Sequence, residues 1–264
     1  MIIDFHTHAY PDKIADKGVQ YIGDFYDLPM YGKGTITHLK QVEREAGVTY
    51  TVVLGVAVRP DLVQSINNWL LSVLDDELIG FGTIHAAYEN NAGEIERFLA
   101  EGCRGAKIHP DMQEYVIDDP RLDPAYDYLS QVEAPLMVHL GDARYEYSMP
   151  QRLAKVMDRF PRLKVIGAHL GGYTRWDDAL TLCGRENLWL DTSSALWALD
   201  PALSRNIIER HGEDRILFGT DYPVSLPERE FQLLDRLGLT DSVKEKILYR
   251  NGAELLKIPA RKDS

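Results

Sequence analysis

Residues 2–8 read IIDFHTH, an apolar run that ends in two histidines separated by one residue. Short runs rich in β-branched and other apolar residues predict β-strands. Seven similar runs follow along the chain, and each is succeeded by a stretch with the periodicity of an amphipathic helix. The eight predicted strands lie at 2–8, 50–57, 78–84, 105–109, 135–140, 163–169, 188–192 and 216–221.

This regular alternation predicts one closed parallel sheet. After the first interval, the spacing between strands leaves room for one helix and two short loops. Eight such units predict an α/β fold of the (β/α)8 type, the TIM barrel. A doubly wound open sheet is the alternative, but it usually carries a glycine-rich turn after its first strand. This chain has His-Thr-His at that point.

The segment after the first predicted strand is longer than the other connections. Residues 9–35 leave room for an additional helix before the amphipathic stretch at 37–46. Long loops on a rigid scaffold commonly serve the functional site, and we expect this first βα loop to do so. We expect a single domain over residues 1–258 and a C-terminal tail at 259–264.

The composition excludes several classes of protein. Of 264 residues, 45% are hydrophobic and 27% are charged, which is typical of a globular protein rather than a disordered or fibrous one. The net charge of −12 disfavours nucleic acid and anionic membranes as partners. The chain has two cysteines, no signal-peptide pattern and no apolar run of about 18 residues. We therefore expect a soluble cytoplasmic protein.

Polar side chains that bind metals recur where the predicted strands end. In a barrel of this type, the catalytic groups lie at the carboxyl ends of the strands. Six such residues are more than folding requires. They are His6, His8, His109, His139, His169 and Asp221.

His6 and His8 are separated by one residue, so on an extended strand both point to the same face. Two hydrogen-bonded histidines without a ligand role are the alternative, but the other groups at the same rim favour an ion. Three imidazoles and one carboxylate are typical of a catalytic divalent-metal site of the zinc type. We predict His6, His8, His139 and Asp221 as the metal ligands.

Eight segments together resemble one known family. The segments read IDFHTHAYPDKIA, FGTIH, GAKIHPDMQ, LMVHLGD, VIGAHLGG, LDTSS, ILFGTDYPVS and ILYRNGAELL, in this order along nearly the whole chain. The chain resembles the amidohydrolase-related metal-dependent hydrolases. This branch of the amidohydrolase superfamily also contains the enzymes similar to aminocarboxymuconate-semialdehyde decarboxylase.

The resemblance implies roles for the residues at the strand ends. It implies that His6, His8 and His139 hold the metal, and that Asp221 binds it and accepts a proton from the bound water. It further implies that His169 acts as an acid or base, or as another metal contact. His169 and Asp221 are therefore the predicted catalytic residues.

The role of Lys107 has three alternatives. In two-metal members of the superfamily that the chain resembles, a carboxylated lysine from the fourth strand bridges the ions, and Lys107 lies on that predicted strand. The branch resembled here is usually mononuclear, and Lys107 shares a strand face with His109. We predict that Lys107 and His109 bind substrate, with a bridging ligand and a structural ion pair as the alternatives for Lys107.

The preferred function is a metal-dependent hydrolase that directs a metal-activated water at a small amide, lactone or ester. The alternative is a non-oxidative carboxy-lyase acting on an aromatic or dienyl acid at the same metal site. The compact chain favours hydrolysis, because decarboxylases of the family resembled here are generally longer. A non-catalytic metal-binding barrel is a third possibility.

The sequence also leads to expectations about cofactor and partners. We expect one divalent metal ion, Zn²⁺ with Mn²⁺ as the alternative, and a small-molecule substrate. We expect no nucleic acid or membrane partner. Members of the family resembled are often dimers, so a homodimer is one candidate assembly, and the sequence leaves the oligomeric state open.

Overall fold

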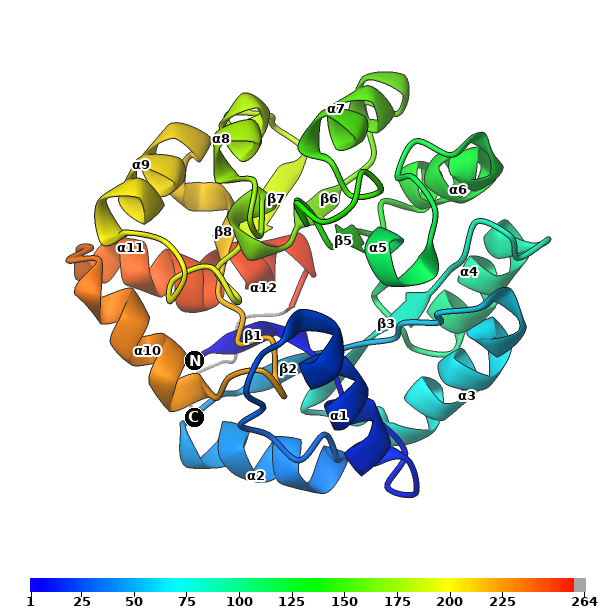
Figure 1. Ribbon diagram of the computed structural model, residues 1–264, viewed down its shortest axis with the longest axis horizontal. Helices are drawn as coiled ribbons and strands as arrows, with labels where there is room; N and C mark the ends of the chain where they lie inside the picture. The colour runs from blue at the N-terminus through cyan, green and yellow to red at the C-terminus, as the bar shows by residue number, and fades with distance from the viewer. Residues whose placement is uncertain (259–264) are drawn as a thin grey trace.

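Eight parallel strands follow one another around a barrel in chain order, with helices outside them, in the computed structural model (Figure 1). The structure describes residues 1–258. The predicted (β/α)8 order is confirmed, and several strands are shorter than predicted because the ladder ends before His109, His139, His169 and Asp221. The strands are β1 Ile3–Thr7, β2 Tyr50–Leu54, β3 Leu78–Thr83, β4 Gly105–Ile108, β5 Leu136–Val138, β6 Val165–Gly167, β7 Leu188–Asp191 and β8 Ile216–Leu217.

Helices connect the strands, and several begin at residues suited to that position. Thr35 accepts a hydrogen bond from the backbone N–H of His38 at the start of α2, and Asp200 caps α9 ahead of Pro201. The longer helices are α1 Ala15–Tyr26, α2 Ile36–Glu45, α3 Val63–Val73, α4 Asn91–Ala100, α6 Asp123–Val132, α7 Pro150–Arg159, α9 Pro201–His211 and α10 Pro227–Arg236. The shorter ones are α5 Pro110–Gln113, α8 Trp176–Ala179, α11 Asp241–Glu245 and α12 Asn251–Leu255.

The barrel closes between β1 and the chain that follows β8. The N–H of Phe5 donates to the carbonyl of Phe218 (2.9 Å), and the N–H of Asp221 donates to the carbonyl of His6 (2.7 Å). The N–H of His8 donates to the carbonyl of Tyr222 (2.7 Å). These bonds join the two ends of the sheet and place residues after β8 beside β1.

A bulge in β1 orients the two histidines. The register with β2 shifts between Asp4 and Thr7, so that β1 contains one extra residue. Below the bulge, Phe5 packs in the barrel interior, and above it His6 lines the cavity at the mouth. Without the extra residue, strict alternation would turn adjacent Phe5 and His6 to opposite faces.

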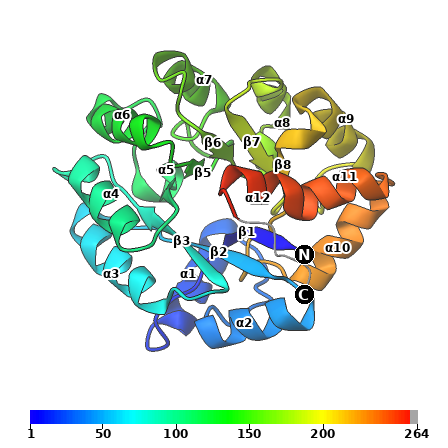
Figure 2. The same cartoon turned by 180° about the vertical axis from the view of Figure 1, so that it is seen from behind.

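The C-terminal helices close the barrel at the end opposite the histidines (Figure 2). A π-helical turn, Lys246–Arg250, joins α11 to α12. The Asn251 amide donates to the carbonyls of Glu213 and Ile216 (both 2.8 Å). A Cβ at position 252 would lie 2.2 Å from Phe5, so glycine permits the close approach of α12 to β1.

The long first connection contains α1, as predicted, and Figure 1 shows this helix in front of β1 and β2. Residues 259–264, the predicted C-terminal tail, lie outside the described residues. Over the described range 1–258, none of the helices combines the length and the apolar character needed to cross a bilayer.

Glu230 on α10 is a buried carboxyl that costs stability when it ionises. It is fully buried, and the Ser225 hydroxyl donates to its Oε1 atom (2.6 Å). Burial raises the pKa of Glu230 to about 8. The unfolded chain therefore loses this proton at lower pH than the folded chain, and the free energy of unfolding decreases as pH rises from about 4.5 to about 8.

We predict that Glu230→Gln removes this loss. The difference in unfolding free energy between the variant and wild type should be about 1–3 kcal/mol more favourable to the variant at pH 9 than at pH 5. Urea unfolding at both pH values measures this. Glu228→Gln, an exposed change on the same helix, is the control. Parallel pH profiles for wild type and Glu230→Gln would contradict the prediction.

Candidate active site

The predicted residues at the strand ends come together around one cavity. Its volume is about 380 Å³. The loop after β1, α1 and the start of α3 form much of its remaining wall. The strand-end residues that line the cavity are His6, His8, His109, His139, His169 and Asp221.

His6, His8 and Asp221 form a group of possible metal ligands, with one ligand atom from each lying within 4.8 Å of the others. The Nε2 atoms of His6 and His8 lie 3.4 Å and 3.8 Å from Asp221 Oδ1. The Nδ1 atom of His8 lies 3.3 Å from the carbonyl of Leu54, which can only accept a hydrogen bond. This contact assigns the proton of neutral His8 to Nδ1 and leaves Nε2 free to bind an ion.

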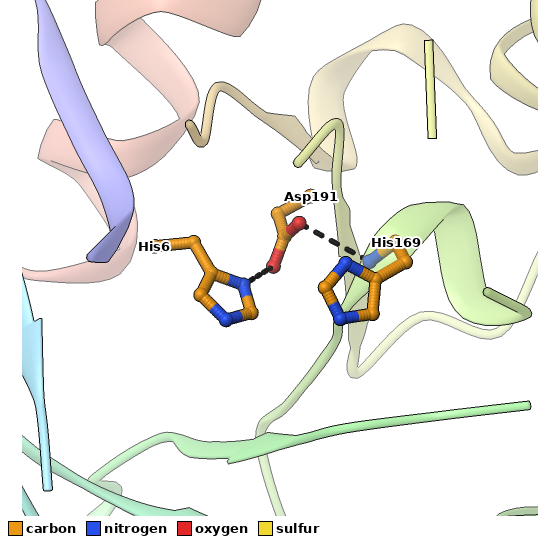
Figure 3. A group of neighbouring side chains, drawn as sticks. All are labelled: His6, His169 and Asp191. Carbon is orange, nitrogen blue, oxygen red and sulfur yellow. Dashed lines mark hydrogen bonds and ion pairs between the residues drawn. The ribbon is translucent and has the colours of Figure 1, made fainter. Parts of the chain in front are cut away.

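Asp191, at the end of β7, orients His6 and the loop that carries His169. Its Oδ2 atom accepts a hydrogen bond from His6 Nδ1 (2.9 Å), and its Oδ1 atom accepts one from the backbone N–H of His169 (3.2 Å) (Figure 3). The first bond leaves His6 Nε2 free on the side of Asp221. Hydrogen bonds of this kind fix the tautomer and ring orientation of metal-binding histidines.

His139 does not lie in the group formed by His6, His8 and Asp221. It groups instead with His109 and Asp111, and its ring stacks on His109 with centroids 4.0 Å apart. Its Nδ1 atom lies 2.9 Å from Nε2 of His169. The structure thus places three of the four predicted ligands together and the fourth on the adjoining wall of the same cavity.

A chain of hydrogen bonds connects the histidines on that wall. The Tyr26 hydroxyl lies 2.8 Å from His109 Nε2 and 3.3 Å from His139 Nε2. At the other end, His169 Nδ1 lies 2.9 Å from the carbonyl of Ser193, so the proton of neutral His169 is on Nδ1. His169 Nε2 can therefore accept a hydrogen bond from His139 Nδ1.

Sequence reasoning missed Tyr26 and the role of Asp191. Tyr26 ends a helix inside the long first connection, where nothing in the pattern distinguishes it from Tyr21. Asp191 could have been found, because it ends a predicted strand in the segment LDTSS, as the histidines end theirs.

The backbone adopts left-handed conformations where three strands end. His169, Ser194 and Asp221 have φ angles of 60°, 48° and 60°. Residues other than glycine rarely adopt such angles, and the strain concentrates at functional sites. The Ser194 hydroxyl donates to Asp221 Oδ2 (2.6 Å), which holds this carboxylate after its unusual turn.

Burial keeps the imidazoles of the site neutral. It lowers the pKa of His6, His8, His109 and His139 well below the ordinary value, and that of His169 to about 4. It also raises the pKa of Asp221 to about 7, against the hydrogen bond from Ser194. Neutral imidazole is the form that binds metal ions. The donor set therefore fits a divalent cation.

Lys107 is fully buried on β4, and its Nζ atom has no hydrogen-bond partner within residues 1–258. Burial lowers its pKa to about 8, although the charges of Asp191 and Asp221 oppose this shift. Lys107 does not line the cavity, whereas His109 does. A structural ion pair at Lys107 finds no support in the contacts of this part of the chain.

The family model described as Amidohydrolase (Amidohydro_2) matches residues 3–258. The chain therefore belongs to this amidohydrolase family, as its motifs predict, and is an enzyme of the amidohydrolase superfamily.

Two curated relatives carry names that specify a reaction. Decarboxylase orsB of Emericella nidulans is 35% identical over 173 residues, which cover 54% of this chain and 51% of that protein. The chain thus matches only about half the length of this relative. The 2-amino-3-carboxymuconate-6-semialdehyde decarboxylase of Dictyostelium discoideum is 24% identical over 264 residues, covering 81% of this chain and 72% of the relative.

A solved structure has the same fold over nearly the whole chain. It is a dihydroxybenzoic acid decarboxylase from Polaromonas sp. with bound manganese and the inhibitor 2-nitroresorcinol. Its TM-score is 0.74 at 16% identity, and the match covers 97% of each chain.

The prediction of a hydrolase acting on an amide, lactone or ester is wrong, because the relatives are decarboxylases. Chain length misled the prediction. Insertions in the loops of a barrel change its length without changing the groups at the strand ends, where the reaction takes place.

Proposed function

We propose that this protein is a metal-dependent, non-oxidative decarboxylase that releases the carboxylate of a small aromatic acid as CO₂. One observation carries the proposal: His6, His8 and Asp221 form a metal-competent group in the same cavity as neutral His169. The decarboxylase relatives support the reaction, and the tyrosine rings that line the cavity suit an aromatic substrate.

His6, His8 and Asp221 would hold the ion, with His139 as the predicted fourth ligand. When bound, a divalent ion supplies positive charge that orients and polarises the oxygen atoms of the acid. This ligand set suits Zn²⁺ and Mn²⁺ alike, and the manganese bound in the Polaromonas structure supports the second. Asp191 would keep the His6 ring in place.

The reaction needs one proton at the carbon that loses the carboxylate. The carbon–carbon bond breaks, its electron pair stays on the ring carbon, and CO₂ leaves. We propose that the carboxyl of Asp221 delivers this proton to the ring carbon. The Ser194 hydroxyl holds that carboxyl at the cavity wall. His169 lines the same cavity and stays a predicted catalytic residue; its Nδ1 proton is engaged by the Ser193 carbonyl, and its Nε2 atom accepts a hydrogen bond from His139 Nδ1.

His109 and Lys107 would act on the substrate in different ways. His109 lines the cavity, so we retain it as a substrate-binding residue. Lys107 lies beneath the lining, near the charges of Asp191 and Asp221. We propose that its positive charge acts on substrate through the electric field of the site.

We predict about one divalent ion per chain, lost in His8→Ala, because this change removes one of the two adjacent imidazoles. Elemental mass spectrometry on protein purified without an affinity tag measures the ion and identifies the metal. His38→Ala on α2, outside the cavity lining, is the matched control and should retain it. Stoichiometric metal in folded His8→Ala would contradict the ligand assignment, and two ions would favour Lys107 as a bridging ligand.

Asp221→Asn should lower turnover of 2,6-dihydroxybenzoate by at least about a hundredfold, the usual scale for loss of a proton-transfer group. Release of CO₂ is the measurement, with metal content determined on the same sample. Asp76→Asn, an exposed change between α3 and β3, should leave turnover unchanged. Turnover at the wild-type rate by metal-loaded Asp221→Asn would remove Asp221 from the mechanism.

A further inference from the structure

The cavity continues away from the predicted metal ligands, between α1 and α3. Figure 1 shows these two helices next to each other at one edge of the barrel, and residues of both line the cavity. At about 380 Å³, the cavity falls within the range of roughly 300–1,000 Å³ that holds drug-sized ligands. Drug-sized ligands have more atoms than a bare hydroxybenzoate, so the cavity has room for a substituent. The apolar lining includes Ile14, Ile22, Val58, Leu62, Ile66 and Trp69.

This part of the cavity offers no partner for a second anionic group. No lysine or arginine of the described chain lines it. A carboxylate or phosphate placed there would lose its hydration without gaining a counter-charge, which is costly. This part of the cavity therefore favours an uncharged group.

Apolar side chains also surround the mouth of the cavity. Ile14 and Tyr21 both line it and are each 49% exposed. Ile14 occupies the N-cap position of α1 and makes no side-chain capping bond. Helices prefer Ser, Thr, Asp or Asn there. Because the Ile14 side chain does not cap the helix, its exposed apolar surface is better explained by what enters the cavity.

We infer that the substrate is an aromatic acid with an apolar alkyl substituent. The substituent lies between α1 and α3, and the carboxylate lies at the group formed by His6, His8 and Asp221. This inference rests on the proposed function for the reacting end of the substrate and on the cavity lining for the other end. Covering Ile14 and Tyr21 removes apolar surface from water, which favours longer chains.

Isothermal titration calorimetry with metal-loaded protein tests the inference. The probes are 2-hydroxybenzoates that carry a methyl, propyl, pentyl or heptyl group at position 6. We expect the Kd to fall about fourfold for each added methylene until the cavity is full. A Kd that is the same for methyl and pentyl would overturn the inference.

Three variants locate the alkyl chain. Val58→Phe replaces a small side chain with an aromatic ring that fills part of the cavity, and it should reduce the dependence of Kd on the length of the alkyl group. Ile66→Ala enlarges the cavity, so the gain in affinity per methylene should extend to longer alkyl groups. This variant also tests the inference if Val58→Phe fails to fold. Gln64→Phe introduces the same ring on the exposed side of α3, away from the lining, and should keep the wild-type dependence.

Release of CO₂ from the same probes separates this inference from the proposed function. Decarboxylation with no dependence of Kd on chain length overturns the inference and leaves the proposed function standing. Binding that strengthens with chain length, without CO₂ release, supports the cavity assignment and overturns the proposed function. If Kd depends on alkyl length equally in wild type, Val58→Phe and Ile66→Ala, the alkyl group binds elsewhere and the inference is overturned.

Discussion

The hydrogen bond from the Asp221 N–H to the His6 carbonyl joins the two ends of the barrel, and the site depends on it. It brings a carboxylate from after β8 within 3.4 Å of an imidazole on β1. The bulge in β1 then turns His6 toward the cavity, and Asp191 from β7 fixes its ring. Neighbouring elements of the closed sheet thus each contribute one part of the predicted metal site.

Burial explains why so many histidines can lie together. Five imidazoles in contact would repel one another if protonated, but removal from water favours their neutral form. Neutral rings can each donate and accept a hydrogen bond, as in the chain of Tyr26, His139 and His169, while His6 and His8 keep an unprotonated Nε2. The same environment holds Lys107 without a hydrogen-bond partner among residues 1–258, and the charges of Asp191 and Asp221 oppose the loss of its proton.

The sequence was sufficient to predict the barrel and six of the residues that line the cavity at its mouth. Strand periodicity located His6, His8, His169 and Asp221, because parallel strands in a barrel all end at the same face. It could not place His139 relative to the other ligands, since that depends on side-chain rotation after the strand has ended. Tyr26 reaches the site from a helix within a long loop, and no local pattern records where such a helix packs.

The chemistry was harder to predict than the fold. A metal-competent rim of histidines is compatible with attack by water or with loss of CO₂, because both reactions use the metal to polarise oxygen atoms. The distinguishing features are the groups that hold a proton and the shape of the cavity. In the proposed mechanism these are the Asp221 carboxyl, held by Ser194, and the apolar cavity between α1 and α3.

The most direct test of the account follows the fate of the carboxyl carbon. Metal-loaded protein is incubated in D₂O with 2,6-dihydroxybenzoate and alkyl-substituted 2-hydroxybenzoates labelled with ¹³C in the carboxyl group, and the products are measured by NMR. The account predicts labelled CO₂ and bicarbonate, together with one deuterium at the ring carbon that carried the carboxylate. Complete recovery of every labelled acid from metal-loaded protein, with no labelled CO₂, would contradict it.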